Sequence, residues 1–378
     1  MMLVRLPVRR VVAAPSALTF AWCWLLLVAF SSSAAAQAGE AAGTQRVPRT
    51  EAQWLQAIQA AAQRVNFSGT VVYQQGGEMR TSRIVHLWDG AVSHERLQML
   101  DGKPREFIRK DTEVQCLIPE SRRVLVERSL PSETFPALGG GAPREILEQY
   151  TLKLGAMERV AGVDCQVLVL EPRDAMRYGL RLCVEPASGL LLRTQTMDQR
   201  QEAIEQMAFT DVRINERIDK ALLRPSWSTE GWKVDRSDHR PTDLAKHGWS
   251  ISAPPGFRRL REVERRMGPP EAPRSTLQAV LSDGLATLSV FIELGSGSQI
   301  ANDLSHSHGS LSGYTRRVGD AMITVVGEVP PATAKAVAMG VTQNPGQNSG
   351  QSSPQNIPQN SANPAAVPLP EPKPKPAR

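Results

Sequence analysis

The spacing of apolar residues predicts one helix followed by a long run of strands. The helix begins near Thr50, which forms a capping-box pattern with Gln53, and apolar residues then recur on one face at intervals of three and four. From Phe67 onward apolar and polar residues alternate, which is typical of strands with one buried face. The apolar helix positions are Trp54, Leu55, Ile58, Ala61, Ala62 and Val65, and the expected strands are Phe67–Tyr73, Thr81–Trp88, His94–Leu100, Glu106–Lys110, Glu113–Ile118 and Arg123–Arg128.

Short connections between these strands predict an antiparallel sheet. The pairs Gly76-Gly77, Asp89-Gly90 and Asp101-Gly102 stand between strands, and such pairs favour tight turns. A second helix is expected over Pro143–Tyr150, after which alternation continues to Ile214. Because parallel strands need long crossover connections, the expected fold class is α+β with predominantly antiparallel β structure.

Changes of pattern divide the chain into parts. Residues 225–247 are polar and aperiodic, and we expect a linker there between an N-terminal domain of residues 37–224 and a smaller domain of residues 248–340. From residue 341 the chain is rich in Gln, Asn, Pro and Ser, which predicts disorder over 341–378. The smaller domain is expected to contain the strands Phe257–Met267, Thr276–Ser282, Ala286–Leu294, Tyr314–Val318 and Ala321–Glu328 and a helix over Pro331–Met339.

The first 36 residues have the three parts of a secretory signal peptide. Three arginines precede an apolar run from Leu18 to Phe30, and Ala34-Ala35-Ala36 provides a small-residue cleavage site. A membrane anchor is the alternative, but the run is shorter than the roughly 20 residues that a spanning helix needs. Removal of the three arginines would lower the formal net charge from +6 to +3, so the basic balance partly reflects targeting. Nucleic acid is therefore not an expected partner.

Two cysteines in adjacent predicted strands point to a disulfide. If the first hairpin of the stretch Gly162–Thr196 is centred on Asp174, Leu170 pairs with Tyr178, and Cys165 lies directly opposite Cys183. Such a bond persists in an oxidising compartment, in agreement with export. Cys116 has no evident partner and is expected to be a buried free thiol.

The sequence contains no recognisable catalytic or metal-binding motif. The common nucleophile, zinc, nucleotide-phosphate and dithiol patterns do not occur, and no cofactor is expected. His306 and His308 have the alternate spacing of two metal ligands on a strand, but only Asp303 is a nearby carboxylate, so we interpret them as part of a solvated loop. His86 and His94 fall in strand segments and are interpreted as surface or packing residues. An enzyme remains a rival for which no catalytic group can be named.

Five segments of the chain resemble the MucB/RseB family of periplasmic regulators of the envelope-stress sigma factor. They occur in matching order over residues 51–339, so the resemblance is more specific than a single motif. The segments are NFSGTVVYQ (66–74), VDCQVLVLEPRDAMRYGLRLCVEPASGLLLRTQTMD (163–198), PPGFRRL (254–260), LSDGLATLSVFIE (281–293) and ITVVGEVPPAT (323–333).

This resemblance implies both a fold and a function. The N-terminal domain would be similar to the lipoprotein carriers LolA and LolB, in which a curved antiparallel sheet wraps helices as a half-barrel, and a smaller antiparallel sheet domain would follow. Members bind the periplasmic part of a transmembrane anti-sigma factor, shield it from the site-one protease, and are released by envelope lipid or lipopolysaccharide. A periplasmic lipid or lipoprotein carrier is the alternative function, and a homo-oligomer is left open.

The resemblance also directs the choice of candidate binding residues. Extended peptides bind open sheet edges, and the concave face of a half-barrel suits acyl chains. The candidates for binding the anti-sigma factor are Asp283, Gly284, Leu285, Phe291, Trp249 and Phe257, of which the last two are also candidates for the interdomain junction. The lipid candidates are Phe67, Val71, Tyr73 and Leu87.

Overall fold

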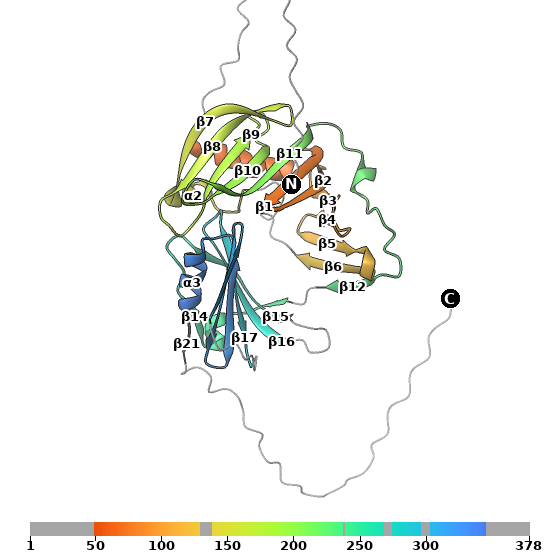
Figure 1. Cartoon of the computed structure of the whole chain (residues 1–378). Coiled ribbons are helices and arrows are strands. Elements are labelled where there is room, and N and C mark those ends of the chain that lie inside the picture. Colours follow the sequence, from red (N-terminus) through yellow and green to blue (C-terminus); the bar gives the residue numbers. More distant parts are fainter. Residues whose placement is uncertain (1–48, 129–137, 237–238, 268–273, 296–302, 345–378) are drawn as a thin grey trace, which may run out of the picture. The chain divides into compact units, whose positions relative to one another are not determined.

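Two large, open and mostly antiparallel sheets make up most of the computed structural model (Figure 1). The structure describes residues 49–128, 138–236, 239–267, 274–295 and 303–344. The predicted signal peptide lies outside these ranges, as do residues 345–378 of the predicted tail. Among the described residues, every helix is too short or too polar to span a bilayer. The predicted α+β class is confirmed.

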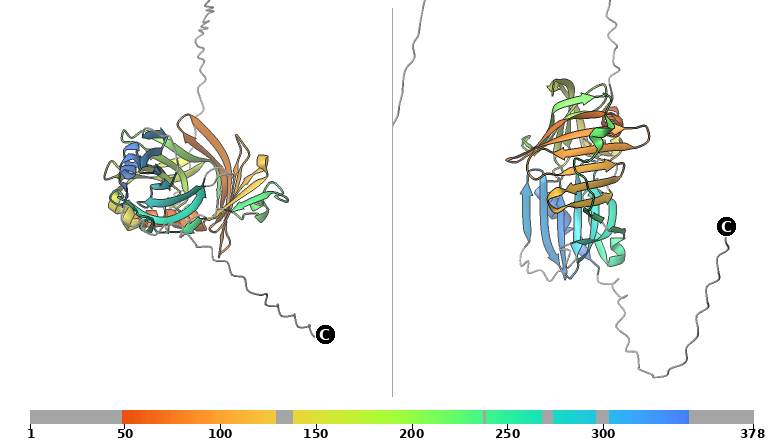
Figure 2. Two further views of the ribbon diagram at one scale, coloured as in Figure 1. Left: turned by 90° about the horizontal axis from the view of Figure 1, so that it is seen from below. Right: turned by 90° about the vertical axis from the view of Figure 1, so that its right-hand side faces the viewer.

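The larger sheet has 12 strands and is strongly curved (Figures 1 and 2). In spatial order the strands are β12, β6, β5, β4, β3, β2, β1, β11, β10, β9, β8 and β7. Their bounds are β1 (Phe67–Gln75), β2 (Glu78–Trp88), β3 (Ser93–Met99), β4 (Glu106–Lys110), β5 (Glu113–Ile118), β6 (Arg123–Arg128), β7 (Tyr150–Val160), β8 (Val163–Pro172), β9 (Gly179–Val184), β10 (Leu191–Met197), β11 (Ala203–Ile214) and β12 (Lys233–Arg236), and short 3₁₀ turns lie at η1 (Pro119–Ser121) and η3 (Lys220–Leu223).

Helix α1 (Glu51–Arg64) covers one face of this sheet together with the short helix α2 (Pro143–Gln149). The predicted capping box begins α1, because the Thr50 hydroxyl accepts from the Gln53 N–H and the Gln53 side chain accepts from the Thr50 N–H. The apolar stripe of α1 packs on β7 to β10, and Val65 ends the helix. This helix-covered core contains Trp54, Leu55, Ile58, Leu138, Ile146, Tyr150, Leu152, Leu168, Leu170, Leu182, Val184 and Leu191.

The smaller sheet has seven strands and a core of its own. In spatial order they are β13, β15, β16, β17, β20, β19 and β18, and helix α3 (Pro331–Met339) packs on β19 and β20 with the bounds predicted from the sequence. The strands are β13 (His239–Pro241), β15 (Arg258–Met267), β16 (Arg274–Ser282), β17 (Thr287–Glu293), β18 (Leu304–His308), β19 (Leu311–Val318) and β20 (Ala321–Gly327); η4 (Leu244–His247) and a two-stranded sheet of β14 (Trp249–Ile251) and β21 (Val341–Gln343) complete this part.

The segment predicted to be aperiodic contributes a strand to each large sheet. β12 pairs in parallel with β6, and β13 pairs antiparallel with β15. Two tryptophans of the same segment, Trp227 and Trp232, pack on the apolar residues of β4 to β6. Each strand is only three or four residues long and mostly polar, so its stabilisation comes from pairing at a sheet edge and leaves no periodic signal in the sequence.

Two further predictions of irregular structure were wrong. His306 and His308 lie in strand β18, not in a loop, because β18 pairs with β19 over its full length. Val341 is fully buried at the start of β21, where pairing with β14 brings the first residues of the predicted tail into the smaller core. In both segments backbone pairing with a distant strand overrides a polar local composition.

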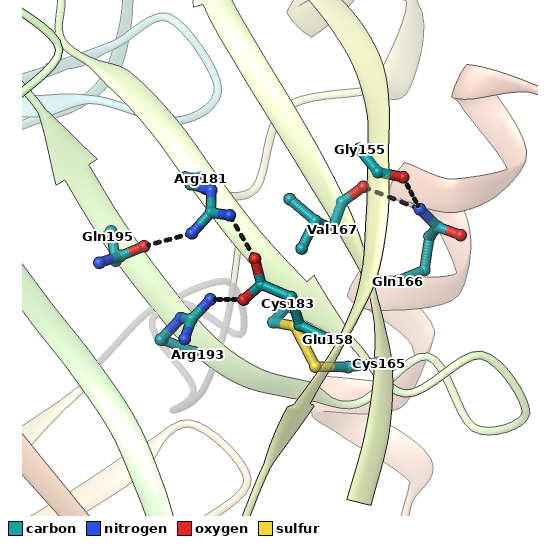
Figure 3. The surroundings of a disulfide bond; sticks show 9 residues. All are labelled: Gly155, Glu158, Cys165, Gln166, Val167, Arg181, Cys183, Arg193 and Gln195. Carbon is teal, nitrogen blue, oxygen red and sulfur yellow. Dashed lines mark hydrogen bonds and ion pairs between the residues drawn. A yellow bond between two sulfur atoms is a disulfide. The ribbon is translucent and has the colours of Figure 1, made fainter.

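The disulfide between Cys165 and Cys183 is present, although the predicted register is wrong by two residues (Figure 3). Leu170 pairs with Leu180 and not with Tyr178, and Val167 stands opposite Cys183. The hairpin is therefore centred on residue 175. The reason is a six-residue loop, residues 173–178, which replaces the tight turn expected from the sequence.

Polar side chains beside the disulfide connect three strands. Glu158 on β7 accepts hydrogen bonds from Arg181 on β9 and Arg193 on β10, and these bonds hold the pKa of its carboxyl below the usual value (Figure 3). Cys116 is a free thiol as expected, but it is only half-buried, and burial raises its pKa.

His86 is buried in the larger sheet as a packing residue. Its ring stacks on Phe67 at a centroid distance of 5.2 Å, and Nδ1 lies 2.8 Å from the Val65 carbonyl oxygen. Nε2 is buried and has no hydrogen-bond partner among the described residues. Burial lowers the pKa of His86, so the ring is neutral at pH 7 and Nδ1–H donates to Val65.

We expect this neutral histidine to make the fold less stable in mild acid. Its pKa is lower in the folded chain than in the unfolded chain, where it lies near 6.5, so stability is lost as the pH falls below about 6.5. The expected loss is about 1 kcal/mol between pH 7 and 5.5. His86→Asn keeps an N–H donor without the titration, and urea unfolding should show a flatter pH dependence for this variant. Equal slopes for the two proteins would contradict the assignment.

Candidate functional site

The turn between β16 and β17 is built around a buried aspartate. Asp283 Oδ1 accepts from the N–H groups of Leu285 and Ala286 at 2.9 and 2.8 Å, which closes the turn. Gly284 has a φ of +102°, a conformation that favours glycine. The remaining oxygen of Asp283, Oδ2, points out of the turn, although the residue as a whole is only 1% exposed. It therefore needs partners from elsewhere in the chain.

Arg177, in the β8–β9 loop of the larger sheet, supplies the main partner. Its Nη1 donates to Asp283 Oδ2 at 2.8 Å, and both side chains are fully buried. Nε and Nη2 donate to Asp174 in the same loop, and Nη2 also donates to the Pro255 carbonyl at 2.7 Å. The guanidinium lies 5.1 Å from the ring centre of Phe257. These contacts satisfy a buried cation on all sides.

Tyr150 completes the cluster from the first residue of β7. Its hydroxyl donates to Asp283 Oδ2 at 3.0 Å, and its ring lies 5.8 Å from the Arg177 guanidinium carbon. Burial, and then the negative charge of Asp283, raise the pKa of Tyr150 well above 10, so the hydroxyl stays protonated as a donor. Arg177, Tyr150 and Asp283, which we call the joint, thus connect the two sheets through one carboxylate oxygen.

Glycine backbones meet beside the joint. The Gly141 N–H donates to the Gly284 carbonyl at 3.3 Å, and a Cβ on Gly141 would lie 2.4 Å from Gly284 Cα. Gln59 on α1 holds the other side of this loop, since its Nε2 donates to the Gly141 carbonyl at 2.7 Å. Leu285, next in the turn, packs against the helix-covered core of the larger sheet. Only glycine permits this close approach.

Other contacts between the sheets surround the joint. Arg258 forms an exposed ion pair with Glu145 on α2, and the Thr333 hydroxyl at the start of α3 donates to the Met176 carbonyl at 2.8 Å. Farther away, the turn between β18 and β19 contacts β1, where the Gln75 side chain donates to the His308 carbonyl at 3.1 Å. The joint is therefore the buried centre of a larger contact.

The structure places most of the candidate partner-binding residues away from an open surface. Asp283, Gly284, Leu285 and Phe257 all contact the larger sheet at or beside the joint. Trp249, which was also a candidate for the junction, is buried in the core of the smaller sheet instead.

Phe291 lies elsewhere on the smaller sheet. It is half-buried on β17, where its register partners are Gln278 and Thr324. Its neighbours in the strand, Val290 and Ile292, point into the core, so Phe291 lies on the opposite face.

Three of the four lipid candidates share the helix-covered face. Phe67, Val71 and Tyr73 alternate along β1, and the register from Tyr73 through Met207 and Thr194 to Leu182 puts them on the side that α1 covers. Leu87 lies on the opposite face, because His86 pairs with Phe67 and the next residue points away.

The candidates on the helix-covered face differ in burial. Phe67 and Val71 are tightly packed, and Phe67 makes an edge-to-face contact with Phe209 at 6.0 Å. Tyr73 is half-buried beside Glu205, and burial, followed by the Glu205 charge, raises its pKa. Space for a ligand at Phe67 or Val71 would require movement of core residues.

Inspection of the sequence missed Arg177 and Tyr150. Both stand next to elements that were recognised, Tyr150 at the end of α2 and Arg177 in the loop after β8. A charged residue inside a loop between two apolar strands was the available signal, but its partner Asp283 is 106 residues away. Within the described ranges no three His, Cys, Asp or Glu side chains gather as a metal site.

Comparison with known proteins identifies relatives over nearly all of the described residues. The model of the MucB/RseB N-terminal domain matches residues 50–227, and that of the MucB/RseB C-terminal domain matches residues 243–342. The sigma factor AlgU regulatory protein MucB of Pseudomonas aeruginosa is 32% identical over 304 residues, which cover 78% of this chain and 92% of that protein. The sigma-E factor regulatory protein RseB of Escherichia coli is 26% identical over 294 residues, or 75% of this chain and 88% of that protein.

Solved structures agree with these relatives. The structure of the Pseudomonas aeruginosa MucA/MucB complex is similar with a TM-score of 0.63 and 28% identity, and covers 78% of this chain and 99% of the matched chain. MucB in complex with the periplasmic part of MucA gives a TM-score of 0.62 and 27% identity with the same coverage. Two family models matched in order, together with a relative of more than 30% identity over most of its length, establish that the chain belongs to the MucB/RseB family.

Proposed function

We propose that this protein is a periplasmic regulator that binds the periplasmic part of a transmembrane anti-sigma factor and shields it from regulated proteolysis. The observation that carries the proposal is the match to MucB over both sheets, since MucB has been solved in complex with the periplasmic part of MucA. The buried Cys165–Cys183 bond supports a periplasmic location, because disulfides persist in oxidising compartments. A regulatory role implies no catalysis.

The proposal includes release by envelope lipid or lipopolysaccharide, and the joint suggests how release could work. Leu285 packs against the same helix-covered core that contains Trp54 and Leu182. An acyl chain that entered this core would have to displace apolar side chains, because protein interiors are close-packed. Displacement of Leu285 would move the turn that carries Asp283 and so disturb the contact between the sheets. Lipid and partner binding would then be coupled through one turn.

Phe67, Val71 and Tyr73 remain the proposed lipid residues, since they share the helix-covered face. The two-domain division also remains a proposal, with boundaries at residues 224 and 248 and a linker that pairs with both sheets. The alternative, a lipid or lipoprotein carrier, gives the second sheet no role.

Binding of the purified protein to the periplasmic segment of the same organism's anti-sigma factor tests the proposal. We expect saturable binding by titration calorimetry, weakened at least tenfold by lipopolysaccharide. An anti-sigma segment that does not bind, together with retained lipid, would favour the carrier. Binding that lipid leaves unchanged would remove the release step and keep the partner.

A further inference from the structure

The outer edge of β18 differs from the other outer strands of the two large sheets. β13 has three residues and ends in Pro241, and three of the four residues of β12 are charged. β7 is interrupted by a register shift between Leu154 and Met157. Proline, charge and irregularity are the usual devices that prevent an edge from pairing with another chain.

β18 has none of these devices. Its sequence, Leu304-Ser-His-Ser-His308, contains no proline and no Lys, Arg, Asp or Glu, and all five residues are exposed. It pairs with β19 in an unbroken register from Leu304 opposite Thr315 to His308 opposite Leu311. No other described strand pairs with it. The strand therefore presents a regular backbone to its surroundings.

The hairpin turn defines which backbone groups point outward. Gly309 and Ser310 form a two-residue loop, with a φ of +57° at Gly309, so the flanking residues His308 and Leu311 are a hydrogen-bonded pair. Hydrogen-bonded and non-hydrogen-bonded pairs alternate along an antiparallel ladder. Ser305 and Ser307 thus fall at non-hydrogen-bonded positions, and their N–H and C=O groups point away from β19. These four groups match one face of an added strand.

Side chains on one face of this edge suggest the chemistry of the added strand. Leu304 and Leu311 are 52% and 37% exposed, and His306 lies across Gly313, which is buried. Arg317, two residues beyond Thr315 on the same face of β19, is exposed and forms no ion pair with the described residues. An extended segment with alternating apolar residues and a carboxylate near Arg317 fits this surface.

We infer that β18 receives an extended segment of the anti-sigma factor by strand addition, with Ser305 and Ser307 supplying the backbone hydrogen bonds. The inference rests on the proposed function for the identity of the partner. The same edge contacts the larger sheet at its end, where Gln75 donates to the His308 carbonyl and Ser310 donates to Glu205. A strand added here would therefore lie beside the contact between the sheets.

Two substitutions at one residue test the inference. Ser307→Pro removes the outward N–H at a position where β19 does not need it, whereas Ser307→Ala removes the hydroxyl and keeps the N–H. With the periplasmic anti-sigma segment as titrant, we expect Ser307→Pro to bind at least tenfold more weakly and Ser307→Ala to bind within twofold of the unaltered protein. Equal affinities for the two folded variants would overturn strand addition at β18.

Further readings separate the remaining outcomes. If Ser307→Pro does not fold, hydrogen exchange of the unaltered protein replaces it: binding should slow exchange at the Ser305 and Ser307 amides, and slowing confined to other residues would overturn the inference. A Ser307→Pro variant that loses self-association but keeps peptide affinity would assign the edge to a second copy of the chain and refute this partner. Failure of the unaltered protein to bind the segment would refute the proposed function itself.

Discussion

Replacing Arg177 with methionine is expected to lower the free energy of unfolding by about 3–5 kcal/mol, the usual cost of removing one partner from a buried ion pair. Asp283 would keep its charge but lose the Nη1–H donor at 2.8 Å, with only Tyr150 left on Oδ2. Methionine retains much of the apolar volume, so the loss reflects charge more than packing. Urea unfolding, followed by far-ultraviolet circular dichroism and tryptophan fluorescence, measures it.

Arg258→Met provides the matched control for this prediction. Its ion pair with Glu145 also connects the two sheets, but it is exposed, and exposed pairs contribute little. The double variant Arg177→Met/Asp283→Asn should recover about 1–3 kcal/mol of the loss, because no buried charge remains and the amide oxygen of the new side chain can still close the turn. Equal stability of the Arg177→Met and Arg258→Met proteins would show that the joint is not a buried ion pair.

Loss of the disulfide is expected to lower the free energy of unfolding by about 3 kcal/mol in the chain-entropy model. The bond joins residues separated by 18 positions, and both cysteines are fully buried. The variant Cys165→Ala/Cys183→Ala should therefore unfold at lower urea concentration, and the unaltered protein should match it under reducing conditions. Cys116→Ala, which removes the free thiol, controls for the chemistry of the substitution.

Alkylation followed by mass spectrometry of the non-reduced protein checks the same bond directly. The expected result is one alkylated cysteine, Cys116, in the unfolded mature chain. Alkylation of both Cys165 and Cys183 would contradict the bond, and unchanged stability on reduction would contradict its contribution.

Local patterns in the sequence were sufficient for elements that local interactions stabilise. The capping box at Thr50 and the prolines before α3 define helix starts, and alternation defines most strands, because both signals act within a few residues. The hairpin of β8 and β9 shows the limit. Its strands were recognised, but the six-residue loop shifted the register by two, since loop length is not encoded in alternation.

Elements that depend on distant partners could not be predicted in the same way. β12, β13 and β18 are short and polar, and each exists because a neighbouring sheet offers backbone groups. The candidate site shows the same effect. Asp283 and Gly284 were selected from the sequence, but their burial depends on Arg177 and Gly141, which lie more than 100 residues away.

Protection of the anti-sigma factor from cleavage tests the central claim most directly. The measurement is the rate at which the site-one protease cleaves the periplasmic segment of the same organism's anti-sigma factor, with the full mature protein present or absent. We expect saturating protein to slow cleavage at least tenfold and lipopolysaccharide to restore the rate. Cleavage at an unchanged rate, in a mixture where the complex has formed, would contradict a shielding role.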